Sequence, residues 1–158
     1  MPLKIYNTLT RRVEEFRPLR ENTVYIYWCG QTVYDSPHLG HARTYLVADM
    51  IRRWLKYRGY SVFYVENITD IDDKIIKRAN ELGISYRELA EGYIKELEEV
   101  MSQLGIHVDY RPRATEHIPE MIQLIKKLLD KGYAYEIDDG VYFDVSKFKE
   151  YGKLSGQK

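Results

Sequence analysis

Residues 28–41 read Trp28-Cys-Gly-Gln-Thr-Val-Tyr-Asp-Ser-Pro-His-Leu-Gly-His41. An apolar, β-like run at residues 24–28 leads into this polar loop, and an amphipathic helical pattern begins where the loop ends. A strand, a loop and a helix in this order form the joint at which open α/β sheets bind nucleotides. His38 and His41 stand at the helix entrance, where backbone donors and the helix dipole favour phosphate. The joint therefore predicts a nucleotide-using enzyme.

The segments around this joint predict an α/β fold. Residues 4–9 and 24–28 have strand patterns, and residues 61–66 read as a continuous buried strand. Between them, residues 40–58 predict a helix that ends at Gly59. A strand, a helix and a strand within about 66 residues have the span of a parallel βαβ unit. We expect the apolar face of this helix to lie in the core, and it consists of Leu46, Val47, Met50, Ile51, Trp54 and Leu55.

The rest of the chain predicts helices and one hairpin. Residues 73–82 and 85–104 have helical patterns, and Ser85 with Glu88 forms a capping box. A further helix is expected from about residue 116 to 131, with Thr115 as its N-cap. Two β-like runs around Asp138-Asp139-Gly140 predict a hairpin. We therefore expect one domain over residues 1–113 and a smaller one over 114–158.

Composition excludes several classes of protein. The chain has 158 residues, with 24 basic and 24 acidic side chains, so it is not a strongly basic nucleic-acid scaffold. Its single cysteine excludes an internal disulfide framework. No run of 18 apolar residues predicts a membrane span, and the start lacks the apolar core of a signal peptide. We expect a globular protein of the cytoplasm that makes no membrane contact.

The residues alone leave structural alternatives open. The two histidines could decorate a helix start or form half of a metal site, and Cys29 could be a small buried hydrophobe. Asp70 or Asp72 could cap the helix that follows, and the roles of these two and of Asp73 stay open. The basic residues of the first long helix read as a solvated face, and they include Arg52, Arg53, Lys56 and Arg58.

Four motifs in this order resemble the N-terminal part of the cysteinyl-tRNA synthetases, a family of class I aminoacyl-tRNA synthetases. They are Cys-Gly-Gln-Thr-Val-Tyr-Asp at 29–35, His-Leu-Gly-His at 38–41, Asn-Ile-Thr-Asp-Ile-Asp-Asp-Lys at 67–74 and Arg-Ala-Thr-Glu-His at 113–117. Tyr-Asn-Thr-Leu-Thr at 6–10 also matches. The resemblance extends over essentially the whole chain.

The resemblance implies a fold and an activity. Residues 1–113 would be the N-terminal part of a Rossmann-like parallel sheet flanked by helices, the class I catalytic domain. Residues 114–158 would begin a connective insertion with a helix and a β-hairpin. The family activates L-cysteine with ATP, accompanied by Mg²⁺, to cysteinyl-adenylate. It then transfers the cysteinyl group to the 3′ end of tRNA(Cys).

The resemblance also implies a role for individual residues. His38 and His41 would donate hydrogen bonds to the charge that develops on the phosphates, and Gly40 would leave room for ATP. Cys29 would be one of four ligands of a Zn²⁺ ion that binds the substrate thiolate. A soft Zn–thiolate bond separates cysteine from serine better than an apolar pocket can. Cys29 would share the cysteine pocket with Gly30, Thr69 and His117, although His117 could equally be a surface histidine in a first helical turn.

The family's other zinc ligands are a second cysteine, a histidine and a glutamate, and the resemblance places them beyond residue 158. We therefore expect the isolated chain to bind zinc weakly and to catalyse poorly or not at all. Two other functions remain open at this point. One is a related ligase that couples activated cysteine to an amine on a small molecule. The other is a non-catalytic binding module derived from such a domain.

Overall fold

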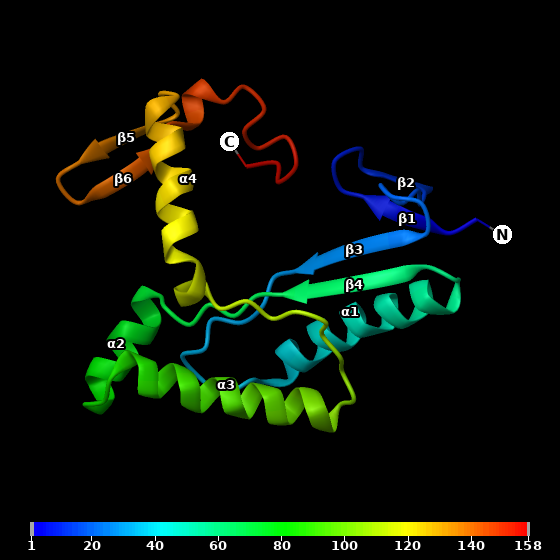
Figure 1. Ribbon diagram of the computed structural model, residues 1–158, viewed down its shortest axis with the longest axis horizontal. Coiled ribbons are helices and arrows are strands. Elements are labelled where there is room, and N and C mark those ends of the chain that lie inside the picture. Colours follow the sequence, from blue (N-terminus) through cyan, green and yellow to red (C-terminus); the bar gives the residue numbers. More distant parts are fainter. Residues whose placement is uncertain (1, 158) are drawn as a thin grey trace. The chain divides into compact units, whose positions relative to one another are not determined.

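The structure is a computed structural model that describes residues 2–157, and the chain forms two compact units. One unit contains residues 18–117, and the other combines the segments that precede and follow it. The first unit carries six elements (Figure 1): β3 (Thr23–Trp28), α1 (Leu39–Tyr57), β4 (Ser61–Glu66), α2 (Asp73–Leu82), α3 (Tyr86–Gln103) and the 3₁₀ helix η1 (Ala114–His117).

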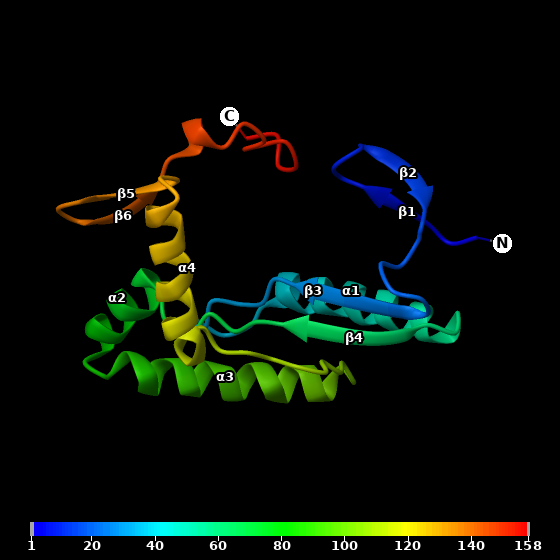
Figure 2. The same ribbon diagram turned by 45° about the horizontal axis from the view of Figure 1, so that its top comes forward.

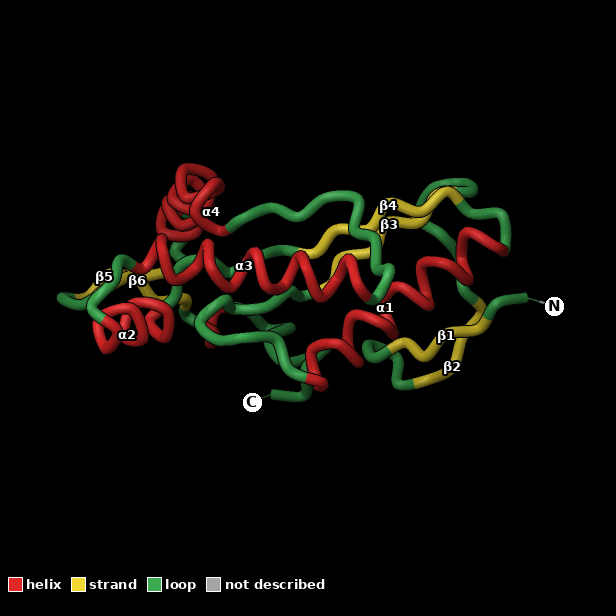
Figure 3. The backbone as a smooth tube through the Cα atoms, turned by 90° about the horizontal axis from the view of Figure 1, so that it is seen from below, coloured by secondary structure: helices red, strands yellow, loops and turns green. Residues whose placement is uncertain are grey.

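The expected βαβ unit is present. β3 and β4 pair in parallel, from Thr23 opposite Ser61 to Trp28 opposite Glu66, and α1 connects them. Figure 1 and Figure 3 both show the two strands side by side. The segment around Tyr110 pairs with the other edge of β4. The N–H of Glu66 donates to the carbonyl of Tyr110 at 3.1 Å. The α/β class predicted from the sequence is confirmed, with a parallel sheet as its centre.

The expectation that residues 61–66 are continuously buried is wrong. Val62 and Tyr64 are buried, whereas Phe63 between them is 42% exposed. Tyr25, the partner of Phe63 in β3, is also exposed. Figure 1 shows α1 and α3 on one side of the two strands, and Figure 2 shows α3 on that side of β4. Side chains alternate across a strand, so a sheet that this unit covers on one face buries every second residue.

The predicted core face of α1 is correct at Leu55 and wrong at most of its other positions. Leu46, Met50 and Trp54 are exposed, and with neighbouring residues they line an apolar groove of about 640 Å³. The helix instead buries a stripe that contains charge, made up of Tyr45, Ala48, Asp49, Arg52 and Leu55. Hydropathy assigned Arg52 to solvent, but its guanidinium lies 2.6 Å from the Asp49 carboxylate inside the unit. A paired charge can be buried where an unpaired one cannot.

Side-chain caps set the limits of α2 and α3, which lie where they were predicted. The Asp72 carboxylate accepts the N–H of Lys74 at the start of α2, and Gly83 ends this helix in the left-handed region at φ 69°. The Ser85 hydroxyl then accepts the N–H of Glu88 at 3.1 Å and starts α3. The sequence signals at Ser85 and Asp72 are therefore confirmed as N-caps.

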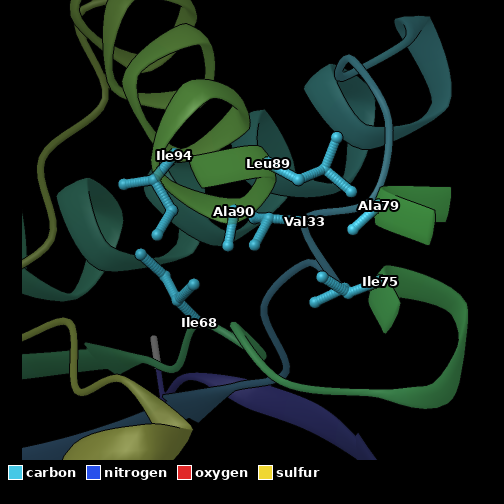
Figure 4. Packing of buried hydrophobic residues seen from close by; sticks show 7 residues of the cluster. All are labelled: Val33, Ile68, Ile75, Ala79, Leu89, Ala90 and Ile94. Carbon is cyan, nitrogen blue, oxygen red and sulfur yellow. The ribbon is translucent and has the colours of Figure 1, made fainter. Parts of the chain in front are cut away.

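One hydrophobic cluster joins these helices to the loops that follow β3 and β4 (Figure 4). Val33 comes from the first loop and Ile68 from the second, and both are at most 2% exposed. The remaining members lie on α2 and α3 and are Ile75, Ala79, Leu89, Ala90 and Ile94. The cluster anchors the two loops on which the candidate site lies.

The second unit holds two hairpins and one helix. β1 (Lys4–Asn7) lies within the strand predicted at residues 4–9, but its pairing with β2 (Arg12–Glu15) was not predicted. The predicted hairpin is present as β5 (Ala134–Ile137) and β6 (Gly140–Phe143). α4 (Ile118–Asp130) follows η1, and η2 (Val145–Lys147) follows β6. Thr115 lies inside η1, so its assignment as the N-cap of a longer helix is wrong. Within residues 2–157, no helix combines the length and apolar character that a membrane crossing requires.

Candidate active site

The two histidines cap the N-terminus of α1. His38 is the N-cap residue, and its Nδ1 accepts the backbone N–H of Gly40 at 3.1 Å. In return, Nδ1 of His41 accepts the backbone N–H of His38 at 3.2 Å. Each ring thus satisfies one of the N–H groups that a helix start leaves without an intrahelical partner. The two histidines therefore do more than decorate the helix start, as they form its cap, and this capping does not compete with a role in phosphate binding.

This reciprocal cap fixes which nitrogen of each ring can donate. Because Nδ1 is the acceptor in both rings, the neutral imidazoles of His38 and His41 carry their proton on Nε2. Burial lowers the pKa of His41 below its ordinary value, and the neighbouring charge of His38 lowers it further. The start of α1 therefore presents two Nε2–H donors in addition to the helix dipole. Donors of this kind at a helix N-terminus can bind an anion.

Gly40 has a local role in this cap. A Cβ at this position would lie 2.9 Å from Cε1 and 3.0 Å from Nδ1 of His38. The missing side chain lets the His38 ring fold back over the first helical turn. The position of Gly40 near ATP remains a prediction.

Cys29 and His41 line the same small pocket, which has a volume of about 210 Å³. The Cys29 side chain is exposed and free, so the alternative of a small buried hydrophobe is wrong. Gly30 follows it in the loop and also lines the pocket. The other lining residues come from the same loop and from α1, and they are Gln31, Thr32, Tyr34, Thr44 and Tyr45.

Thr69 lies beside the wall of this pocket. Its N–H donates to the carbonyl of Gln31 at 3.1 Å, and its carbonyl accepts the N–H of Val33 at 3.2 Å. The two loops therefore continue the parallel pairing of β3 and β4 past the ends of the strands. The expected proximity of Thr69 to Gly30 and Cys29 rests on this pairing, while its contact with cysteine remains a prediction.

Asp70 does not cap the helix that follows it. Its buried carboxylate accepts both the N–H and the hydroxyl of Thr115, at 3.0 Å and 2.5 Å. Thr115 belongs to η1, the helix that ends at His117. Asp70 thus ties the Asn-Ile-Thr-Asp loop to the segment that carries His117. The structure places His117 at the end of η1, and its part in a cysteine pocket is still a prediction.

A buried polar cluster of Tyr64, Glu66 and Arg111 packs against the loop that contains Gly30. The Glu66 carboxylate is 0% exposed at the end of β4, and it accepts the Tyr64 hydroxyl at 2.7 Å. Arg111 lies 3.6 Å away on its other side. Burial raises the pKa of Glu66, and the Tyr64 hydrogen bond and Arg111 offset part of this effect. A Cβ on Gly30 would lie 3.2 Å from Cγ of Glu66, so the cluster packs directly under the loop.

Comparison with known proteins identifies the family. Residues 15–158 match the domain described as "tRNA synthetases class I (C) catalytic domain". The chain belongs to this synthetase family. It is 58% identical over 159 aligned residues to the cysteine–tRNA ligase of Thermococcus onnurineus and 60% identical to that of Pyrococcus abyssi. Each of these alignments covers 100% of this chain and 33% of the relative, so the chain spans about a third of the length of the curated relatives that it matches.

Solved structures agree on the fold of the synthetase domain. A Mycobacterium tuberculosis methionyl-tRNA synthetase in complex with methionyl-adenylate is 23% identical, with a TM-score of 0.68 over 72% of this chain and 23% of that one. The agnB2 LeuRS of Agrobacterium radiobacter K84, in a ternary complex with tRNA and LeuAMS, is 22% identical. It has a TM-score of 0.65 over 70% of this chain and 15% of that one. The curated relatives do not favour the two alternatives, a small-molecule ligase or a non-catalytic module.

The synthetase domain does not contain a complete metal site in the part that the structure describes. Across residues 2–157, no three His, Cys, Asp or Glu side chains group closely enough to hold a metal ion. His38 and His41 are therefore not half of a metal site formed within these residues. Cys29 alone supplies a suitable soft ligand. The thiol of Cys29 is thus the one soft Zn²⁺ ligand that residues 2–157 offer.

The structure adds residues that sequence reasoning missed in this synthetase domain. Gln31 is 6% exposed, lines the pocket, and donates from its side-chain amide to the carbonyl of Asp35 at 3.0 Å. Tyr45 reaches the pocket from a buried position on α1. Asn67 connects the two loops through its side chain. The available signal for Asn67 was its place directly after a parallel strand, where polar side chains collect at ligand sites.

Proposed function

We propose that the chain is the N-terminal catalytic portion of a cysteine–tRNA ligase that activates L-cysteine with ATP and transfers it to tRNA(Cys). The observation that carries the proposal is the pocket at the capped start of α1 that Cys29 and His41 both line. The 58% and 60% identity to proteins of that name supports it. The division into a catalytic part, residues 1–113, and an insertion from residue 114 remains part of this proposal, as does action in the cytoplasm.

The start of α1 would bind the phosphates of ATP, which carries Mg²⁺. As the cysteine carboxylate attacks the α-phosphate, a bond forms to phosphorus and the bond to pyrophosphate breaks. Negative charge grows on the phosphate oxygens during this exchange. The Nε2–H groups of His38 and His41 are preorganised donors for that charge, since their Nδ1 atoms are already held by the helix cap. Gly40 keeps the first turn open for the nucleotide.

The cysteine side of the pocket would use the two loops. Gly30 and Thr69 would line the position of the amino acid, with His117 contributing from η1. Cys29 would be one protein ligand of a Zn²⁺ ion, since residues 2–157 contain no group of three His, Cys, Asp or Glu side chains that could hold the ion by themselves. When bound, such an ion would supply a soft partner for the substrate thiol. The tRNA acceptor end would receive the cysteinyl group from the adenylate.

The test is cysteine-dependent exchange of pyrophosphate into ATP, measured with the complete gene product. Two variants separate chemistry from folding. Asn is a good N-cap and Gln at the third helical position completes a capping box, so His38→Asn and His41→Gln keep both caps without an imidazole. Each is expected to reduce the exchange rate by about a hundred- to a thousandfold. The free energy of unfolding should change by less than about 0.5 kcal/mol.

His107→Asn is the matched control, because this exposed histidine pairs with Asp109 and is not among the residues that line the pocket. It should leave the exchange rate unchanged. Exchange at the wild-type rate in both the His38→Asn and His41→Gln variants would overturn the assigned roles. A wild-type gene product that shows no cysteine-dependent exchange would overturn the proposed function itself.

A further inference from the structure

Asn67 occupies a position between the two loops of the candidate site. Its side-chain carbonyl accepts the backbone N–H of Gly30 at 3.0 Å and the Tyr27 hydroxyl at 2.9 Å. Its side-chain NH₂ donates to the Thr69 hydroxyl at 3.3 Å. One amide therefore contacts the loop that carries Cys29 and also the residue expected to line the cysteine pocket.

The backbone on both sides of Asn67 is firmly held. Glu66 and Ile68 are 0% and 2% exposed. Their N–H groups donate to the carbonyls of Tyr110 and Pro112 at 3.1 Å and 2.8 Å. Asn67 thus projects its side chain from the sheet edge, a rigid support from which a functional group can be placed reproducibly.

Gly30 brings the first loop close enough to use this support. A Cβ on Gly30 would lie 1.6 Å from the backbone carbonyl oxygen of Asn67, which no side chain can tolerate. The two backbones therefore approach at the point where the regular pairing of β3 and β4 has ended, after Trp28 and Glu66. The Asn67 side chain supplies the acceptor that the Gly30 N–H lacks there. Cys29, directly before Gly30, is positioned by the same bond.

The same amide orients the Thr69 hydroxyl. A hydroxyl has one proton and two lone pairs, and the Asn67 NH₂ occupies one of the lone pairs. The Thr69 proton is then available to an acceptor other than Asn67. Because the backbone N–H of Gly30 can only donate, the amide cannot turn over without losing the Gly30 bond, and this keeps its NH₂ facing Thr69. The orientation of Thr69 and the position of the Cys29 loop are therefore set together.

We propose that Asn67 is a positioning residue that fixes the Cys29–Gly30 loop and the Thr69 hydroxyl relative to each other, and so sets the geometry for binding cysteine. This inference rests on the proposed function for its substrate. It assigns no contact between Asn67 and the reacting atoms. Its effect should appear in the affinity for cysteine and not in the affinity for ATP, because the phosphate donors at the start of α1 are held by their own cap.

The experiment compares Asn67→Leu, which has a similar shape and no hydrogen bonds, with Asn67→Asp, which keeps the acceptor for Gly30 and Tyr27. Pyrophosphate exchange by the complete gene product gives KM for cysteine and for ATP separately. Asn67→Leu is expected to raise the KM for cysteine by about ten- to a hundredfold, the typical effect of a misplaced binding group. Its KM for ATP should change by less than about twofold. Asn67→Asp keeps the acceptor for Gly30 but accepts the Thr69 proton, so it should raise the KM for cysteine by less than Asn67→Leu does.

Asn80→Leu is the matched control, since Asn80 is exposed on α2, and it should leave both constants unchanged. Exchange of the Gly30 amide proton, measured by NMR on the 158-residue chain, tests the contact without catalysis. Protection should be lost in Asn67→Leu and kept in Asn67→Asp. Equal changes in both KM values, no change in either, or unaltered Gly30 protection in Asn67→Leu would each overturn the positioning role. A wild type without cysteine-dependent pyrophosphate exchange would refute the proposed function. Protection of the Gly30 amide proton would still test whether the Asn67 side chain holds the Gly30 N–H.

Discussion

The imidazole rings of His38 and His41 stack on each other, with centroids 3.8 Å apart and an interplanar angle of 21°. The stack follows from the cap, because each ring turns its Nδ1 toward a backbone N–H of the first helical turn. Two protonated rings at this separation would repel each other. The cap therefore requires neutral rings, because Nδ1 must accept, and the stack disfavours protonation of both rings at once.

The titration of His41 should show this requirement. Its pKa is expected below the ordinary value of 6.5, because burial and the neighbouring His38 both disfavour the charged ring. Between that lowered pKa and 6.5, the unfolded chain binds more protons than the folded chain. The stability contributed by neutral His41 is therefore complete above about pH 6.5 and falls as the pH drops toward the folded pKa. Proton NMR of the ring hydrogens measures the titration directly.

A variant of the neighbour separates the two causes. His38→Asn keeps the cap and removes the nearby charge, so the His41 pKa should rise but stay below 6.5, since burial, the larger cause, remains. A wild-type His41 that titrates at or above 6.5 would contradict the assignment.

Gly30 should not tolerate any side chain. Its Cβ would meet the backbone carbonyl oxygen of Asn67 at 1.6 Å, and backbone cannot move aside as a flexible side chain can. Gly30→Ala is expected to lower the free energy of unfolding by about 1–3 kcal/mol, as overpacking does. Urea denaturation of the chain measures the change.

Gly92 provides the comparison on α3, because nothing lies within 4 Å of its would-be Cβ. Gly92→Ala should raise the free energy of unfolding by about 0.5–1 kcal/mol, since alanine restricts the unfolded chain and favours a helix. Equal effects of the two substitutions would show that Gly30 and Asn67 do not approach as described.

The sequence predicted those parts of the fold that depend on local signals. Asp72 and Ser85 cap α2 and α3, and Gly83 ends α2, because a cap needs only residues within one helical turn. The buried face of α1 could not be predicted in this way. Its apolar stripe around Trp54 is exposed, and its buried stripe contains Asp49 and Arg52. Hydropathy ranks each residue alone and cannot show that two charges neutralise each other.

In the candidate site too, the features that depend on nearby residues could be predicted and the contacts between distant residues could not. Cys29, His38 and His41 lie within one continuous stretch, so their meeting at a strand–loop–helix joint could be expected from spacing. The contact between Asp70 and Thr115 spans 45 residues. Both residues have a local alternative as helix caps, and only the tertiary structure shows that they use each other instead.

The bond between Asp70 and Thr115 should be measurable as a coupling energy. Asp70→Ala is expected to cost about 1–3 kcal/mol, because it leaves the part-buried N–H and hydroxyl of Thr115 without their acceptor. Thr115→Val removes only the hydroxyl bond. In the double variant, the two losses should fall short of additivity by about 0.5 kcal/mol or more, as for residues in direct contact. Urea unfolding of the four chains completes the cycle.

Asp72→Ala is the control for this cycle. It removes the N-cap of α2 at a cost of about 1 kcal/mol, without touching η1. Its loss should simply add to that of Thr115→Val. Full additivity between Asp70→Ala and Thr115→Val would contradict the direct contact.

Asp49 should be the most costly charge to remove from α1. Its carboxylate is held by Arg52 and Arg53, and the Arg53 guanidinium also donates to the carbonyl of Gly105 at 2.6 Å, beyond the end of α3. Asp49→Asn would leave the buried Arg52 without its counter-charge, which typically costs about 3 kcal/mol or more. Glu81→Gln is the matched control, since Arg78 and Glu81 form an exposed pair with the same spacing, worth at most about 1 kcal/mol.

The free energy of unfolding at acidic pH provides a second test of the role of Asp49. Burial acts to raise its pKa, but hydrogen bonds from Arg53 and Arg52 outweigh burial and hold the pKa below its ordinary 3.8. The stability that its charged form contributes is therefore complete above pH 3.8 and lost as the pH falls through the lowered folded pKa. Urea unfolding below pH 3.8 should show a shallower pH dependence in Asp49→Asn than in the wild type. Parallel profiles, or a loss no larger than that of Glu81→Gln, would mean that the buried pair does not hold α1 in place.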